Sequence, residues 1–447
     1  MGEFFGTDGI RGVAGQYPLD SRTITGIGYS LARELESRLG HPPMIIIGRD
    51  TRESGEWIEA AIAHGVHLTK ARTQSAGIIT TPGVAYLTRA LGAQAGIVIS
   101  ASHNSYQDNG IKIFAPSGQK LDDALEQAIE RDLKAGTPDL PEAPDRRPEP
   151  DASLATGYLA FLRDQIGRGL NLNGLRITVD CANGAAYDLA PQLLASLGAE
   201  LTTINAQPTG QNINRDCGSL YPDLLQRAVI ETKSDLGLAF DGDADRLMII
   251  DEGGQLVDGD LILFIMADYF LAQGNLSGNR VVATVMSNLG LELALKERGV
   301  KLVRTSVGDK YVLDELLKGG GSIGGEQSGH IIFPEISLAG DGLITALEVL
   351  RAMVESKKTL RDLSRGFKRY PQITINVQVS SKPQLESVPA ITEVIAAVER
   401  ELGGKGRLLV RYSGTENKAR VMIEGEDQSI IRSQAERITQ VIQAELG

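Results

Sequence analysis

Three closely spaced aspartates between two apolar segments constrain the fold of this chain more than any other feature. Asp241, Asp243 and Asp245 lie in one short run, and the flanking segments 236–240 and 247–250 are apolar. Both segments have the length of buried strands, so the acidic run is predicted to be a loop between two strands. Carboxylates this close repel one another by roughly 1 kcal/mol per pair even in water. A divalent cation would remove that repulsion, and Mg²⁺ and Ca²⁺ both prefer oxygen ligands.

Two other interpretations fit the spacing alone. A solvated acidic turn is the commoner origin of an arbitrary acidic cluster. An EF-hand calcium loop has the same spacing of acids, and Glu252 even falls on its twelfth position. The sixth position is Arg246, however, where that loop requires glycine, and strands rather than helices are expected on both sides. The EF-hand is therefore excluded, whereas the acidic turn is disfavoured only by the motifs that follow.

Composition narrows the functional classes. The chain has 447 residues and 51 glycines, which fits about three domains and an α/β enzyme with ligand loops lined by backbone. A net charge of -12 argues against nucleic acid or an anionic membrane as a partner. Cys181 and Cys217 give no disulfide framework, no signal peptide is apparent, and no apolar run approaches the ~20 residues of a membrane span. We therefore expect a cytoplasmic protein.

Strand and helix patterns alternate along most of the chain, which predicts βαβ units. Strands are expected at residues 44–47, 96–100, 176–180, 235–240, 280–285 and 301–304. Helices are expected at residues 58–68, 82–91, 187–197, 259–271, 289–298 and 309–317. The proline-rich stretch 136–150 is typical of a linker. From residue 373 the pattern predicts a smaller α+β domain, with strands 373–379, 407–411 and 420–424 and helices 388–402 and 429–446.

Three polar loops each follow an apolar strand, at residues 101–104, 241–246 and 326–330, and the second and third contain glycine. Ligands of open α/β sheets bind beyond the carboxyl ends of the strands. We therefore interpret the first three units as divergent structural repeats whose loops together build one site.

Residues of the first loop have both a functional and an ordinary interpretation. Ser102 beside His103 could be a nucleophile with a base, but a serine that caps a helix is the commoner case. Lys112 follows an expected turn at Asn109-Gly110. Its ammonium group could neutralise a phosphate or shuttle a proton, or it could simply be solvated.

The third loop and two arginine-containing segments complete the candidates. Glu326 and Ser328 could hydrogen-bond vicinal sugar hydroxyls, and His330 titrates near neutrality, although a core histidine also fits. Near the C-terminus, two hydroxyls and a glycine turn between arginines are what phosphate binding requires, although an ordinary hairpin turn also fits: Arg411, Ser413, Gly414, Thr415 and Arg420. Arg11 lies in a glycine-rich segment near the N-terminus.

The motifs match a known family when they are taken together. SASHN, DGDADR, GEQSGH and SGTE occur in this order, at residues 100–104, 241–246, 325–330 and 413–416. Each motif is weak alone, but the ordered set is specific, and the chain resembles the α-D-phosphohexomutases over nearly its whole length. Several details resemble the branch that acts on glucosamine phosphates: FGTDGIRG at 5–12, QNIN at 211–214 with CGS at 217–219, VGDKY at 307–311 and Gln327.

The resemblance implies both a fold and a set of roles. The fold is three similar mixed-sheet α/β domains plus a smaller C-terminal α+β domain around a central cleft, with boundaries at residues 1–150, 151–252, 253–368 and 369–447. Ser102 matches the phosphorylated serine, which binds Mg²⁺ together with Asp241, Asp243 and Asp245. Catalytic roles near the transferring phosphoryl group fall on Arg11, His103, Lys112 and His330. Substrate binding falls on Arg246, Glu326, Ser328, Arg411, Ser413, Gly414, Thr415 and Arg420.

Two departures from the family pattern are expected to loosen loops. Proline usually follows SHN, but this chain has Ser105. Tyr412 and Asn417 stand where the family usually has prolines on both sides of SGTE. Each change frees φ, and neither removes a phosphate donor.

The activity implied is that of an isomerase that interconverts glucosamine 6-phosphate and glucosamine 1-phosphate through a phosphoserine enzyme and a bisphosphate. Activity on glucose or mannose phosphates is the nearest alternative. A phosphatase and a sugar-phosphate-binding regulator are further alternatives, and the retained Ser102 and aspartates argue against a pure binder. The expected partners are sugar phosphates, one Mg²⁺ per site and a hexosamine bisphosphate activator, and a homodimer is possible.

Overall fold

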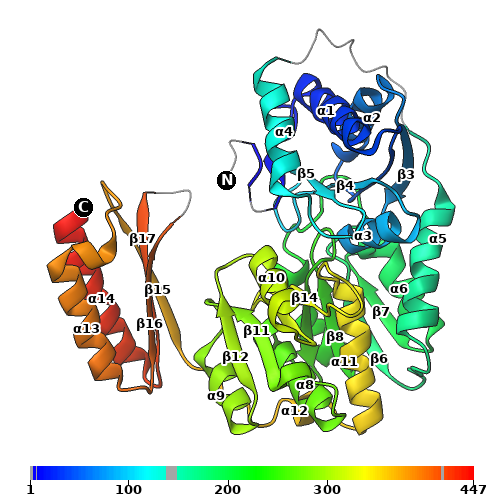
Figure 1. The fold of residues 1–447 in the computed structure, drawn as a ribbon. Helices are drawn as coiled ribbons and strands as arrows, with labels where there is room; N and C mark the ends of the chain where they lie inside the picture. Colours follow the sequence, from blue (N-terminus) through cyan, green and yellow to red (C-terminus); the bar gives the residue numbers. More distant parts are fainter. Residues whose placement is uncertain (1–3, 7, 137–147, 414–416) are drawn as a thin grey trace. The chain divides into compact units, whose positions relative to one another are not determined.

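The computed structural model describes residues 4–6, 8–136, 148–413 and 417–447, so most of the expected linker lies outside the described residues. The chain divides into two compact units, Met1–Val285 with Val303–Arg365 and Met286–Leu302 with Gly366–Gly447. The described residues form three mixed sheets flanked by helices and a smaller antiparallel sheet near the C-terminus (Figure 1). This arrangement confirms the predicted class of three α/β domains and a smaller C-terminal domain.

The first domain has a five-stranded sheet in the order β1-β5-β4-β2-β3. Its strands are β1 (Ile10–Val13), β2 (Met44–Arg49), β3 (Arg72–Ile78), β4 (Ala95–Ile99) and β5 (Asp108–Phe114). Strands β2, β3 and β4 are parallel, whereas β5 is antiparallel to both β4 and β1. Helices α1 (Ser21–Leu39), α2 (Gly55–His67) and α4 (Asp123–Lys134) cover one face, and α3 (Thr81–Ala90) covers the other (Figure 1).

The second domain repeats this plan with the sheet order β10-β9-β8-β6-β7. Its strands are β6 (Arg176–Asp180), β7 (Glu200–Ile204), β8 (Leu236–Phe240), β9 (Leu247–Asp251) and β10 (Leu256–Val257). Strands β6, β7 and β8 are parallel, and β9 runs antiparallel to β8 and β10. Its helical elements are α5 (Ala152–Phe161), the π-helical turn η1 (Leu162–Ile166), α6 (Ala186–Ser196), η2 (Gly218–Leu220) and α7 (Asp223–Thr232).

The third domain has the sheet order β12-β11-β13-β14. Its strands are β11 (Arg280–Thr284), β12 (Lys301–Thr305), β13 (Gly324–Gly325) and β14 (Ile331–Ile332). Strand β13 is parallel to β11 and antiparallel to β14. Its helices are α8 (Gly259–Ala272), η3 (Ser277–Asn279), α10 (Asp309–Gly319), α11 (Gly342–Ser356) and α12 (Leu360–Leu363).

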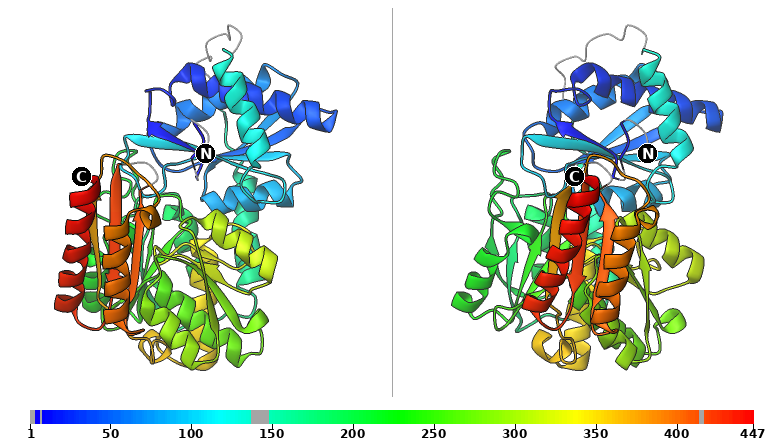
Figure 2. Two further views of the ribbon diagram at one scale, coloured as in Figure 1. Left: turned by 60° about the vertical axis from the view of Figure 1, so that its left-hand side comes forward. Right: turned by 90° about the vertical axis from the view of Figure 1, so that its left-hand side faces the viewer.

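The C-terminal domain has a three-stranded antiparallel sheet in the order β15-β17-β16. Its strands are β15 (Gln372–Gln378), β16 (Arg407–Tyr412) and β17 (Lys418–Glu424), and its helical elements are η4 (Leu385–Ser387), α13 (Pro389–Leu402) and α14 (Gln428–Leu446). Figure 2 shows α13 and α14 side by side over one face of this sheet. Helix α9 (Leu289–Glu297) belongs to the same compact unit, and the buried Glu424 accepts a hydrogen bond of 3.3 Å from the N–H of Leu289 at its start.

The three loops singled out from the sequence occupy equivalent places in their sheets. Each follows a strand that runs parallel to its inner neighbour, namely β4, β8 or β13. Each then leads into an antiparallel strand beside it, namely β5, β9 or β14. The predicted structural repeat is confirmed by this shared topology, which accounts for polar loops at the same edge of each sheet.

Most predicted elements agree with the structure to within a few residues, but the turn expected at Asn109-Gly110 is wrong. Both residues lie inside β5, where Gly12 of β1 pairs with Asn109. A Cβ atom on Gly110 would lie 2.6 Å from the carbonyl oxygen of Ser100 and 2.9 Å from that of Ile10. Glycine is therefore present because three backbone segments meet there and not because the chain turns.

Two remaining points concern the chain as a whole. No helix among the described residues is both long and apolar enough to cross a membrane. Cys181 and Cys217 are free and buried, as expected from the absence of a disulfide framework.

Candidate functional site

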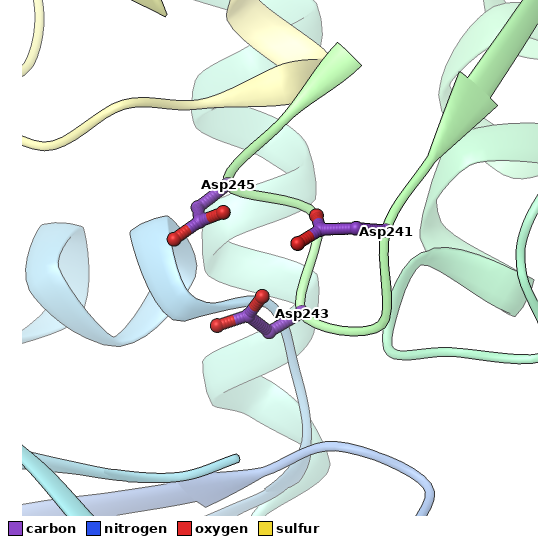
Figure 3. A group of neighbouring side chains, drawn as sticks. All are labelled: Asp241, Asp243 and Asp245. Atoms are coloured by element: carbon purple, nitrogen blue, oxygen red, sulfur yellow. The ribbon is translucent and has the colours of Figure 1, made fainter. Parts of the chain in front are cut away.

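Three buried carboxylates converge on the loop between β8 and β9. Asp241, Asp243 and Asp245 each present an oxygen atom within 4.8 Å of the others, and all three side chains are buried (Figure 3). A solvated acidic turn is therefore the wrong interpretation of this run.

The backbone of this aspartate loop is held by the first turns of three helices, one from each α/β domain. Successive carbonyls of the loop accept hydrogen bonds from helix-start N–H groups: Gly242 from Ala185 before α6 (2.8 Å), Asp243 from Thr81 of α3 (3.0 Å) and Ala244 from Gly342 of α11 (3.0 Å). The N-terminus of a helix carries a partial positive charge, which favours nearby carboxylates. The conformation of the aspartate loop therefore depends on contacts with all three α/β domains.

Ser102 faces this cluster from the loop between β4 and β5. Its hydroxyl donates a hydrogen bond of 2.7 Å to Oδ2 of Asp241 and lies 3.2 Å from Nδ1 of His103. Ser102 is buried and has a φ of 52°, in the left-handed region that serine rarely adopts. It connects two strands, so it is not a helix cap.

Lys112 brings a positive charge into the same cluster. Its Nζ atom lies 2.9 Å from Oδ2 of Asp243 and 3.3 Å from Oδ2 of both Asp245 and Asp8. The side chain is buried, and although burial lowers its pKa, the three carboxylates raise the pKa well above its ordinary value. Lys112 is therefore a fixed internal cation and not a solvated lysine. Asp8 also pairs with Arg11, which reaches the cluster through this shared carboxylate.

The carboxylates are incompletely neutralised by the protein. Burial and the charges of Asp245 and Asp243 raise the pKa of Asp241 well above its usual value. Burial also acts to raise the pKa of Asp245, but Lys112 and His330 hold it well below the usual value. One oxygen each of Asp243 and Asp245 is buried without a hydrogen-bond partner among the described residues. Hard, buried carboxylate oxygens of this kind fit Mg²⁺.

His330 joins the third domain to the cluster. Its Nδ1 atom lies 3.7 Å from Oδ2 of Asp245, and its Nε2 atom lies 3.7 Å from Oδ2 of Asp309. Burial lowers the pKa of His330, but these carboxylates outweigh burial and raise the pKa to about 9. The imidazole is therefore protonated near neutral pH. A cavity of about 360 Å³ lies beside it, bounded by Lys112 and Asp245 and extending towards Lys120.

His103 has the opposite electrostatic setting. Burial, together with the charges of Arg246 and Arg11, lowers the pKa of His103 to about 4. Its ring is therefore neutral near pH 7. Arg246 itself donates a backbone hydrogen bond of 3.2 Å to Oδ1 of Asp241, and its Nε atom lies 3.9 Å from Oδ1 of Asp245.

The loop of the third domain is anchored on the strand that leaves the aspartate loop. The N–H of Leu247 donates a hydrogen bond of 3.0 Å to the carbonyl of Gly329. The two candidate sugar-binding side chains face each other, since the hydroxyl of Ser328 lies 3.3 Å from Oε2 of Glu326. The other oxygen of Glu326 accepts a hydrogen bond of 3.0 Å from the N–H of Gly308.

The phosphate-binding candidates of the C-terminal domain lie on the hairpin formed by β16 and β17. Arg411 is directly opposite Arg420 across the two strands. Burial and the charge of Arg420 lower the pKa of Arg411, a sign of like charges that an anion would relieve. Ser413 is buried at the end of β16, and its carbonyl accepts a hydrogen bond of 2.9 Å from Lys382. Gly414 and Thr415 lie outside the described residues.

Several residues that support the site lie outside the motifs that the sequence singles out. Thr81 donates a hydrogen bond of 2.6 Å from its hydroxyl to Oδ2 of Asp243. Lys120 bridges Asp8 and Asp309 at 2.7 Å from each. Arg52 is buried beneath the Ser102 loop, three residues after the end of strand β2. The rule that polar residues gather after apolar strands could have found Arg52, whereas the others act across long stretches of sequence.

Comparison with known families agrees with this organisation. Four consecutive segments match the models described as phosphoglucomutase/phosphomannomutase alpha/beta/alpha domains I, II and III and C-terminal domain, at residues 2–139, 157–254, 258–370 and 375–441. A protein named phosphoglucosamine mutase from Solibacter usitatus is 47% identical, with 100% of this chain and 99% of the relative covered. The chain therefore belongs to the phosphoglucomutase/phosphomannomutase family, which confirms the resemblance, and its class is that of an isomerase.

Solved structures share the fold. A phosphoglucomutase/phosphomannomutase family protein from Burkholderia thailandensis superimposes with a TM-score of 0.79 at 22% identity, covering 99% of this chain and 97% of that one. An N-acetylphosphoglucosamine mutase from Aspergillus fumigatus, solved with GlcNAc-6P and magnesium, gives a TM-score of 0.68 at 20% identity, covering 98% and 95%. At such identities the likeness establishes the architecture alone.

Proposed function

We propose that this chain interconverts glucosamine 6-phosphate and glucosamine 1-phosphate, with Ser102 as the residue that carries the phosphoryl group. The observation that carries the proposal is the hydrogen bond of 2.7 Å between the hydroxyl of Ser102 and Asp241, within a buried cluster of three carboxylates. A nucleophile so close to candidate magnesium ligands is what phosphoryl transfer requires, because this chemistry depends mainly on positioning and electrostatics.

The proposed cycle begins with phosphorylated Ser102. The free hydroxyl of the sugar monophosphate attacks the phosphorus atom, the bond between phosphorus and the serine oxygen breaks, and a sugar bisphosphate forms. The hydroxyl proton passes to a neighbouring base, and His103 is available for it because its ring is neutral near pH 7. The bisphosphate then reorients in the site, and its other phosphoryl group is transferred to Ser102. Substrate and product therefore exchange without net loss of phosphate.

The protein supplies the charges that such a transfer needs. Asp241, Asp243, Asp245 and the Ser102 phosphoryl group would hold one Mg²⁺, which when bound neutralises charge on the transferring group. Lys112 and protonated His330 lie against the same aspartates and supply fixed positive charge. A phosphoserine carries about -1.5 to -2 charges, so fixed cations beside it stabilise both the resting enzyme and the transition state.

Sugar recognition is proposed for the third domain and the C-terminal hairpin. Glu326 and Ser328 already face each other, and they would bind sugar hydroxyls. The paired Arg411 and Arg420, with Ser413, would hold the phosphate that does not react. The choice of glucosamine follows from the relative at 47% identity, which is named phosphoglucosamine mutase, and from the glucosamine-branch segments of this chain.

Coupled assays with glucosamine 6-phosphate, glucose 6-phosphate and mannose 6-phosphate test the proposal. All three are run at matched Mg²⁺ with the corresponding bisphosphate as activator. We expect kcat/KM to be highest for the glucosamine substrate, with residual glucose activity because the phosphate contacts are shared. A polar group that the site must pair discriminates more strongly than an apolar pocket does. Better turnover of glucose or mannose phosphate would refute the sugar assignment and leave the phosphohexomutase class intact.

The role of Ser102 has its own control in the same preparation. Intact-mass measurement after incubation with a hexose bisphosphate should show one added phosphoryl group in the wild type and none in Ser102→Ala. Ser100 lies two residues away and also has a buried hydroxyl, which donates a hydrogen bond of 2.6 Å to Asp50. Phosphate mapped to Ser100 or Ser328 would contradict the assignment.

A further inference from the structure

Two side chains from different domains grip the backbone of the Ser102 loop. Nη2 of Arg52 donates a hydrogen bond of 3.0 Å to the carbonyl of Ser102, and Nδ2 of Asn214 donates one of 2.8 Å to the same oxygen. Both donors also reach the carbonyl of Asn104, at 2.9 Å and 3.0 Å respectively. Arg52 and Asn214 therefore each link the carbonyl of Ser102 to the carbonyl of Asn104.

These contacts stabilise Ser102 in a backbone conformation that is unfavourable for an isolated serine. Its φ of 52° is in the left-handed region, which is unfavourable for a residue with a Cβ atom unless the surroundings enforce it. Gly242 of the aspartate loop also packs closely against the carbonyl of Ser102. A Cβ atom on Gly242 would lie 2.5 Å from the carbonyl oxygen of Ser102 and 2.8 Å from Nδ2 of Asn214. The carbonyl of Ser102 thus lies among Arg52, Asn214 and Gly242.

Arg52 secures the loop from within the first domain. Its guanidinium is buried, and its Nε atom lies 2.9 Å from Oδ2 of Asp50. Its Nη1 atom donates hydrogen bonds to the carbonyls of Asp108, at 3.0 Å, and of Ser105. Ser105 replaces the proline that the family usually has, so these contacts oppose the loosening expected from that substitution.

Asn214 reaches the loop from the second domain. It belongs to the QNIN segment, to which the proposed reaction assigns no role. Asn214 itself has a φ of 58°, a region that asparagine tolerates better than most residues, and its N–H donates a hydrogen bond of 2.9 Å to Ala182. The side chain of Asn212 in the same segment bonds within its own turn, where it donates to the carbonyl of Gln207 at 3.0 Å and accepts from the N–H of Thr209 at 2.8 Å.

We propose that Asn214 is a positioning residue for Ser102. Its amide fixes the loop so that the Ser102 hydroxyl faces Asp241, and it thereby links the phosphoryl-carrying loop of the first domain to the domain that carries the aspartates. The inference rests on the proposed function of Ser102. It predicts that loss of the amide donors displaces the reacting oxygen without altering the residues that bind the sugar. Misplacement of a reacting group by 1 Å can cost about 100-fold in rate.

Two substitutions at position 214 separate this role from a backbone role. Asn214→Gly removes the amide but adopts a positive φ without strain. Asn214→Asp keeps the size of the side chain but replaces the donor with a carboxylate. The matched control is Asn212→Asp, the same change two residues away. For each protein we would measure kcat and KM for glucosamine 6-phosphate, the thermal midpoint, and phosphorylation of Ser102 by intact mass.

We expect kcat to fall about 10- to 100-fold in both Asn214 variants, with KM within about 3-fold of the wild type. The rate at which a bisphosphate phosphorylates Ser102 should fall in parallel, and Asn212→Asp should resemble the wild type. Wild-type kcat in Asn214→Gly would overturn the inference, as would a rise in KM at unchanged kcat or an equal loss in Asn212→Asp. If Asn214→Asp does not fold, Asn214→Gly decides. Failure of the proposed function is distinct, because the wild type itself would then prefer another sugar phosphate or carry no phosphoryl group on Ser102.

Discussion

The aspartate loop of the second domain and the arginine hairpin of the C-terminal domain both place like charges side by side, but they differ in surroundings. The aspartates are buried, whereas Arg411 and Arg420 keep part of their surface exposed. The loop carbonyls are held by helices from three domains. The hairpin needs only its two strands to bring the arginines opposite each other.

The difference shows how burial sets the demands on a charged site. In a low-dielectric interior the same charges repel more strongly than at a wet surface. The aspartate loop therefore requires Lys112, His330 and helix N-termini, and two of its carboxylate oxygens still have no hydrogen-bond partner among the described residues. At the hairpin, water and salt screen the arginines. We therefore expect large effects from single changes in the aspartate loop and moderate, salt-sensitive effects at the hairpin.

The largest effect is expected for Asp243→Asn. Asp243 has one buried oxygen with no hydrogen-bond partner in the described part of the chain, and its other oxygen lies 2.9 Å from Lys112. Loss of its charge removes a candidate metal ligand and leaves Lys112 with fewer counter-charges. Activity should fall on the order of 10³-fold or more, equivalent to several kcal/mol of transition-state stabilisation. The measurement is kcat across a Mg²⁺ titration, with Asp223→Asn, an exposed aspartate of the same domain, as control. Full wild-type activity in excess chelator would contradict the metal assignment.

The second prediction concerns the buried carboxylate of Asp341, whose surroundings differ from those of Asp245. Asp245 has cationic neighbours, whereas Asp341, which caps α11, is buried and accepts hydrogen bonds from Tyr158 at 2.5 Å and from the N–H of Leu343 at 2.8 Å. Burial outweighs these bonds and raises the pKa of Asp341 from 3.8 to about 6. Well below pH 3.8 this carboxyl is protonated in both the folded and the unfolded chain. As pH rises to 6 the unfolded chain releases the proton first, so folding loses stability across that window.

Asp341→Asn should remove this pH dependence while retaining an oxygen acceptor for the cap. Relative to the variant, the wild type should lose about 2 kcal/mol of unfolding free energy between pH 4 and pH 6, since one pKa unit corresponds to about 1.4 kcal/mol and the unfolded group is already partly ionised at pH 4. Urea unfolding at pH 4, 5, 6 and 7 measures it. Asp151→Asn is the control, because hydrogen bonds from Ser153 and Gln74 lower the pKa of Asp151 and the difference should have the opposite sign. A pH-independent difference for Asp341 would refute the prediction.

The same comparison explains how much could be predicted from the sequence. Strand β6 was predicted with its observed bounds, Arg176–Asp180, because an apolar run bounded by polar residues is a local signal. The three polar loops were predicted to build one site, and Lys112, His330 and Ser102 do meet the aspartate loop. The position of a loop after a strand is a property of sequence order, so it can be predicted before any long-range contact is known.

The partners of these loops could not be predicted in the same way. Thr81 and Asn214 form hydrogen bonds with residues more than 100 positions away. Threonine and asparagine are also ordinary residues for loops and helix starts, so neither residue type gives a signal in the sequence. Gly110 has the sequence signature of a turn but lies in a strand because β1 pairs with β5 from a distant part of the chain. Local patterns predicted which segments carry charge, whereas the contacts that hold the charge in place depend on tertiary structure.

The smallest effect is expected at the hairpin. Arg420→Ala removes one of two facing guanidinium groups, and a charge-assisted hydrogen bond is worth roughly 1.5–3 kcal/mol. KM for both sugar monophosphates should rise about 10- to 100-fold. Phosphorylation of Ser102 by a small phosphodonor should change little, since such a donor has no second phosphate to hold. Equal loss in both assays would mean that Arg420 serves folding or the chemical step.

Salt provides the sharper test of the contrast between the two regions. Screening is nearly complete beyond about 10 Å at 0.1 M salt for exposed charges and is much weaker for buried ones. KM of the wild type should therefore rise several-fold between 0.05 M and 0.5 M salt, and the rise should be smaller in Arg420→Ala, which has lost part of the exposed contribution. Because Lys112 and its aspartates are buried, kcat at saturating substrate and Mg²⁺ should vary little over the same range. If instead kcat fell with salt and the KM of both proteins rose equally, the exposed hairpin would not be the origin of the salt dependence, and the division between a buried catalytic cluster and a screened binding hairpin would be wrong.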